Sequence, residues 1–158
     1  MSYFEYASCT PPKDFQDWDS LVIAAGGLSG TGHSDGIKLY VPGVTQTALD
    51  SALSSYDFVA AENKRLQRIV DSKIERLWSA ADRSVSSSIS GAAIGLLTMG
   101  VMQAKPKALA VQTWIKSVWD LYYSRKAAVT AISELNTDFS SCGPMPCSVP
   151  ELIAELGM

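Results

Sequence analysis

The single histidine is the first residue whose side chain could do acid–base chemistry. His33 lies beside Ser34 and Asp35 in a glycine-rich stretch. A catalytic Ser-His-Asp triad is assembled from segments that are distant along the chain, and three neighbours in one loop do not provide that geometry. We therefore predict an exposed loop histidine, no catalytic residue and no enzymatic activity.

The glycines around this histidine are the second candidate, because glycine-rich loops can cradle phosphates. Five of the eleven residues from 26 to 36 are glycine. The dinucleotide fingerprint G-x-G-x-x-G is not met, since Gly36 comes one residue too late after Gly30 and Gly32, and a strand pattern follows. The Lys-Ser or Lys-Thr that ends a P-loop is absent too. We predict a flexible surface loop and no cofactor.

The three cysteines offer a possible metal or disulfide site. An odd number at low density is not the framework of a secreted disulfide protein. Cys142 and Cys147 flank the turn CGPMPC, and a zinc site there would draw its further Cys or His ligands from Cys9 and His33. We predict unpaired thiols and no metal site, with a disulfide across the CGPMPC turn as the alternative.

The densest aromatic cluster of the chain lies between residues 114 and 125. Lys116 and Lys126 lie nearby, and the five residues of the cluster are Trp114, Trp119, Tyr122, Tyr123 and Arg125. Trp, Tyr and Arg carry much of the binding energy at protein interfaces. Trp119 and Tyr123 are four residues apart and so share one helix face. We predict that the five residues form a subunit or partner interface; core packing and a ligand site are the alternatives.

Two amphipathic helices are predicted to position this cluster. A short helix capped by Thr45 comes first, and the first long helix begins after the capping residue Asp57. Apolar residues at steps of three and four form a stripe along each long helix. The second runs from about Lys107, after Pro106, to Asn136. The first stripe is Leu66, Ile69, Val70, Ile74, Leu77, Trp78, Ala81 and Val85. The second is Val111, Trp114, Ile115, Val118, Leu121, Tyr122, Arg125, Val129, Ile132 and Leu135.

The segment between these helices carries no charge over residues 84–104. Its length and its G-x-x-x-G step, Gly91 and Gly95, are compatible with a membrane span. Serines fill its first part, however, and the strongly apolar portion is too short to cross a bilayer. We predict a buried or closely packed helix, kinked or broken by its glycines, and no membrane association.

The predicted fold is mainly α, an antiparallel helical hairpin over residues 44–136. Residues 1–43 are predicted as an irregular glycine-rich arm, with a short helix or strand at 14–23 and one strand at 37–41. Residues 137–158 form a tail containing proline and cysteine, with a small helix over 150–156 capped by Ser148. Two helices cannot bury both apolar stripes, so the arm or other subunits must cover them.

Charge is distributed unevenly along the 158 residues. The formal net charge is −3, which disfavours a strongly basic nucleic-acid binder. Residues 61–83 and 105–126 are net basic, whereas residues 1–60 and 127–158 are net acidic. This pattern suggests that the ends fold over the middle or meet a partner.

The middle of the chain resembles small accessory proteins encoded among the tail genes of tailed bacteriophages. The resemblance covers residues 44–130. It rests on the T-x-x-x-L-x-x-A-L entry in VTQTALDSALSSYD, on the basic helix ENKRLQRIVDSKIERLW, and on W-x-x-x-x-W-x-x-Y-x-x-R-K in the second helix. It implies a virion protein that acts by binding and carries no catalytic signature.

The expected function is therefore structural, in a phage tail or fibre-attachment region. The expected partners are further copies of the chain and neighbouring virion proteins, with no cofactor and no nucleic acid. The expected location is the virion, assembled in the bacterial cytoplasm. The alternative is a soluble bacterial helical binding module, a regulator or chaperone that releases its partner.

Overall fold

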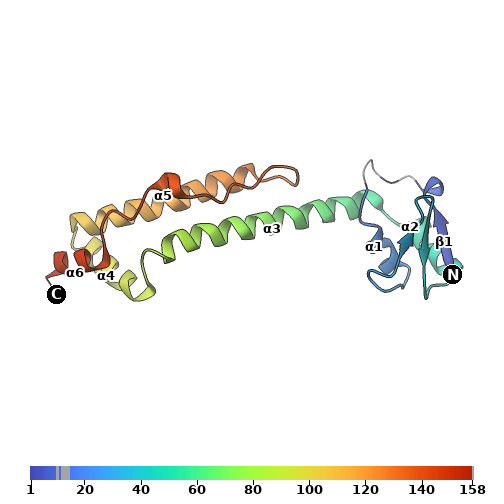
Figure 1. Cartoon of the computed structure of the whole chain (residues 1–158), viewed down its shortest axis with the longest axis horizontal. Coiled ribbons are helices and arrows are strands. Elements are labelled where there is room, and N and C mark those ends of the chain that lie inside the picture. Colours follow the sequence, from blue (N-terminus) through green and yellow to red (C-terminus); the bar gives the residue numbers. More distant parts are fainter. Residues whose placement is uncertain (10, 12–14, 158) are drawn as a thin grey trace. The chain divides into compact units, whose positions relative to one another are not determined.

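Helices make up 62 % of the chain and strands 7 %, which confirms the mainly α class. The computed structural model describes residues 1–9, 11 and 15–157 (Figure 1). Contacts divide the chain into two compact units, Met1–Arg68 and Ile69–Met158, and the boundary falls within the long helix α3. Each unit is described by itself below.

Unit 1 contains a small antiparallel sheet of three strands in the order β1-β3-β2. They are β1 (Ser2–Glu5), β2 (His33–Ser34) and β3 (Lys38–Val41), and a 3-10 turn, η1 (Tyr6–Ser8), follows β1. Ser2 pairs with Val41, and His33 pairs with Tyr40. Only β3 was predicted from the sequence. The other two strands are short and depend on pairing with β3.

Two helices and the inner face of the sheet enclose the core of unit 1. They are α1 (Trp18–Ala24) and α2 (Gln46–Ser55), and the Thr45 side chain caps α2 as predicted, accepting the N–H of Ala48. The start of the predicted 14–23 element lies outside the described residues. The buried residues are Phe4, Leu21, Val22, Ala25, Leu39, Val41 and Leu49. The prediction of an irregular arm is wrong, because this region has a core of its own.

Helix α3 (Phe58–Ser86) is the long amphipathic helix that the sequence predicted. Asp57 caps it, with a carboxylate oxygen 2.9 Å from the amide nitrogen of Ala60. Within unit 2, its side chains Leu77 and Ala81 are buried against the antiparallel helix α5 (Pro106–Ala128). Trp78 lies on the predicted stripe but is 48 % exposed.

The uncharged segment forms a separate helix, α4 (Gly91–Met102), bent by 71° from α3. The segment is broken as predicted, but the break lies at residues 87–90, and Gly95 and Gly100 lie inside a continuous α4. Gly100 lies where α4 meets α5, because a Cβ there would stand 2.5 Å from the Cβ of Ala108. The glycine thus permits the two helices to approach closely.

Helix α5 ends at Ala128, well before the predicted end at Asn136. Pro106 occupies its first turn, where a missing N–H costs nothing. The chain then turns, with Thr130 and Ser133 exchanging hydrogen bonds. The predicted stripe is wrong at Ile132, which is 94 % exposed, whereas Val129 and Leu135 still pack against the core of unit 2.

The tail returns along unit 2 through a 3-10 turn, η2 (Ser140–Cys142), to α6 (Val149–Leu156). Ser148 and Glu151 form a capping box at α6, as the predicted cap required. Leu152 is buried against α4 and α5. The carboxylate of Glu155 accepts the N–H of Lys107 and so satisfies the first turn of α5.

Candidate interaction surface

Trp114 and Tyr122 belong to the core of unit 2 and not to an exposed surface. Their exposed fractions are 6 % and 5 %. They pack with Leu77, Val118 and Phe139. The indole N–H of Trp114 donates to a backbone carbonyl of the returning tail, 3.0 Å away. The expectation that these two residues contact a partner is corrected, because the chain's own tail covers them.

Arg125 is occupied by contacts within the chain. Its guanidinium donates to the carbonyl of Asp138 at 2.6 Å and lies 4.9 Å from the ring centre of Phe139. It therefore holds the 136–139 segment against α5. This tertiary role could not be predicted from a helix pattern.

Three aromatic side chains do reach the surface of unit 2 together, and we call Trp78, Trp119 and Tyr123 the aromatic face. The ring centres of Trp78 and Trp119 are 6.4 Å apart. Tyr123 is 62 % exposed and Trp119 half-buried. Tyr122 links the two α5 members, with ring centres 5.6 Å from Trp119 and 5.1 Å from Tyr123.

The sequence predicts two of the three members of the aromatic face. Trp119 and Tyr123 were predicted to share a helix face. Trp78 was assigned to the buried stripe, although it directly follows Leu77, which is fully buried. Successive residues on a helix lie about 100° apart, so this adjacency was the available signal.

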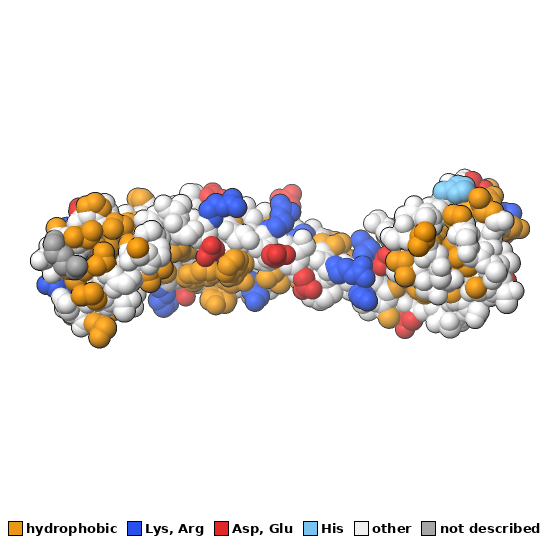
Figure 2. All heavy atoms as spheres, turned by 90° about the horizontal axis from the view of Figure 1, so that it is seen from below, with side chains coloured by type: hydrophobic (Ala, Val, Ile, Leu, Met, Phe, Trp, Pro, Cys, Tyr) orange, Lys and Arg blue, Asp and Glu red, His pale blue; other side chains and the backbone are white. Residues whose placement is uncertain are grey.

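Charged side chains flank the aromatic face on both helices. On α3 they are Asp71 and Asp82, whereas Glu75 lines a groove beside the tail with Arg76 and Arg83. On α5 they are Lys126 and Lys116, and the Lys116 ammonium is ion-paired with the Asp120 carboxylate at 2.5 Å. Figure 2 shows hydrophobic side chains gathered over the helices of unit 2, with acidic and basic side chains around them.

A groove of about 550 Å³ lies between α3 and the tail. Arg83, serines of α3 and Asp138 line it. The Asp138 carboxylate accepts the backbone N–H and the hydroxyl of Ser140, and these bonds lower its pKa. The Asp138 carboxylate is thus hydrogen-bonded within its own loop.

The glycine-rich loop of unit 1 is ordered by two carboxylates. The Asp19 carboxylate accepts the Ser29 hydroxyl and the Gly30 N–H, and the Asp35 carboxylate accepts the N–H groups of Lys38 and Ile37. These bonds lower the pKa of both carboxyl groups. The loop is therefore an ordered hairpin, whereas the sequence predicted a flexible loop.

Residues 32–36, GHSDG, match the G-x-S-x-G spacing of hydrolase nucleophiles, which the prediction of no catalytic residue left out of account. That motif works as a sharp turn from a strand into a helix. Here Ser34 lies in β2, next to a hairpin turn into β3. Its hydroxyl accepts the N–H of Gly36. His33 stacks on Tyr40, with ring centres 5.1 Å apart.

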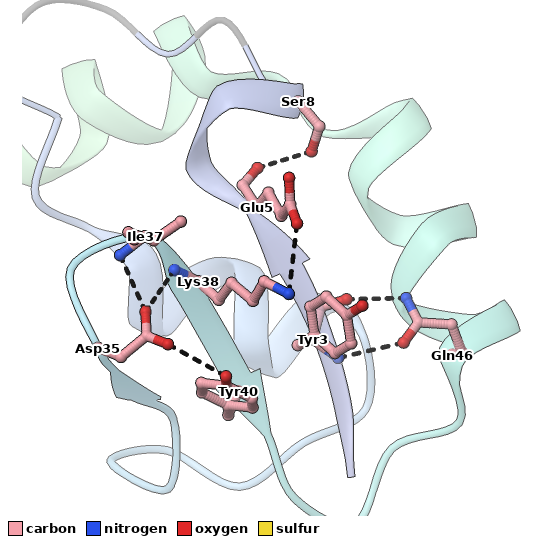
Figure 3. A network of polar contacts seen from close by, with 8 residues as sticks. All are labelled: Tyr3, Glu5, Ser8, Asp35, Ile37, Lys38, Tyr40 and Gln46. Carbon is pink, nitrogen blue, oxygen red and sulfur yellow. Dashed lines mark hydrogen bonds and ion pairs between the residues drawn. The ribbon is translucent and has the colours of Figure 1, made fainter.

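The outer face of the sheet is held by contacts among its own side chains (Figure 3). The Lys38 ammonium lies 3.3 Å from the Glu5 carboxylate and 4.2 Å from the ring centre of Tyr3. The Gln46 amide exchanges two hydrogen bonds with the backbone of Tyr3 at the edge of β1. This amide occupies the edge where another strand would otherwise pair.

The thiols of Cys9, Cys142 and Cys147 are free, which confirms the prediction of unpaired cysteines. Burial raises the pKa of Cys9 and of Cys147, so both favour the thiol form. Over residues 1–9, 11 and 15–157, no group of three or more His, Cys, Asp or Glu side chains is arranged to hold a metal ion.

Among the helices described, none is by itself long and apolar enough to span a bilayer. The bent pair α3 and α4 passes that test by length and composition.

Comparison with known proteins adds no assignment. No family model, curated protein or solved structure matches this chain.

Proposed function

We propose that this chain is a structural component of a larger assembly and acts by protein–protein contact through the aromatic face. The observation that supports this is the cluster of Trp78, Trp119 and Tyr123 at the surface of a folded unit. Clustered Trp and Tyr side chains with charged residues around them are typical of interface hot spots.

The assembly that we propose is the tail or fibre-attachment region of a tailed bacteriophage. The support is the resemblance of residues 44–130 to tail accessory proteins. The chain would then be part of the virion, formed in the cytoplasm of the bacterial host. Its neighbours would be further copies and adjoining tail proteins, held by mass action and not by catalysis.

The test is the presence of the chain in purified particles, measured by quantitative mass spectrometry beside known tail proteins. We expect the wild-type chain in fixed proportion to them. Trp78→Ser with Tyr123→Ser should reduce incorporation at least about tenfold, because two hot-spot side chains are lost. Ile132→Ser, at an exposed site away from the aromatic face, is the control and should incorporate normally.

A wild-type chain that is abundant in the infected cell yet absent from particles would overturn the virion proposal. It would favour the soluble helical binding module, for which the same face would serve a transient partner.

A further inference from the structure

We draw no further inference here: the strongest candidate, the aromatic face that Trp78 on α3 forms with Trp119 and Tyr123 on α5, belongs to the surface already described, and nothing in the structure shows what covers it.

Discussion

Lys73 fixes the segment that follows α5 through three backbone carbonyls. Its ammonium lies 3.0, 2.7 and 2.7 Å from the carbonyl oxygens of Thr130, Ala131 and Ser133. An ammonium has three N–H donors, so this side chain is fully used. It thereby satisfies backbone carbonyls of the turn that follows α5.

We expect Lys73→Met to lower the free energy of unfolding by about 1–3 kcal/mol, because hydrogen bonds to a charged donor are lost while the aliphatic stem is kept. Urea denaturation measures the change. Lys64→Met, at an exposed position earlier on the same helix, should change it by less than about 0.5 kcal/mol. Equal losses in the two variants would contradict the role given to Lys73.

Asp35 makes the hairpin of unit 1 sensitive to acid. The N–H groups of Lys38 and then Ile37 favour its ionised form and lower its pKa in the folded state. A carboxyl whose pKa is lowered by folding stabilises the fold above its ordinary pKa, and this contribution is lost as the pH falls through the lowered value.

We therefore expect the hairpin around His33 to loosen in that acidic window. The measurement is the amide NMR signals of residues 34–40 during an acid titration. Asp35→Asn removes the ionisable group and should flatten the response. An unchanged titration in Asp35→Asn would show that another group is responsible.

At the scale of elements, two of the three glycines of the short apolar helix α4 are in opposite situations. A Cβ at Gly100 would collide with Ala108, whereas a Cβ at Gly95 would meet nothing within 4 Å. The two positions therefore form a matched pair on one helix.

We expect Gly100→Ala to destabilise the protein by about 1–3 kcal/mol through overpacking between α4 and α5. Gly95→Ala should stabilise it by about 0.5–1 kcal/mol, because alanine is the better helix former. Thermal unfolding of both variants provides the test. A stabilised Gly100→Ala variant would show that α4 and α5 do not depend on this close contact.

At the scale of the whole molecule, the chain has more than one core. Leu21 is fully buried in unit 1, and Leu152 is buried in unit 2 within a separate cluster. Deleting a buried leucine side chain costs about 2–5 kcal/mol. The separation of the clusters allows each unit to lose stability by itself.

We expect Leu21→Ala to speed hydrogen exchange in residues 2–41 while residues 91–157 keep their protection. Leu152→Ala should have the reverse effect. Hydrogen exchange followed by mass spectrometry measures both regions in one experiment. Equal acceleration of both regions by either variant would mean that the two units unfold as one.

The sequence by itself determined the features that depend on neighbouring residues. The periodicity of α3, the break before α4, the start of α5 at Pro106 and the caps at Thr45 and Ser148 are all local. Trp119 and Tyr123 could be placed on one helix face for the same reason.

Only the tertiary structure decided which of these side chains are exposed. Trp114 and Tyr122 are buried because the returning tail covers them, while Trp78 meets Trp119 at the surface because α3 and α5 pack side by side. Tertiary contacts also decided that β1 and β2 form, because both strands pair with β3. They decided the end of α5 as well, where Lys73 binds backbone carbonyls far along the chain. Such contacts join distant residues, and no local pattern encodes them.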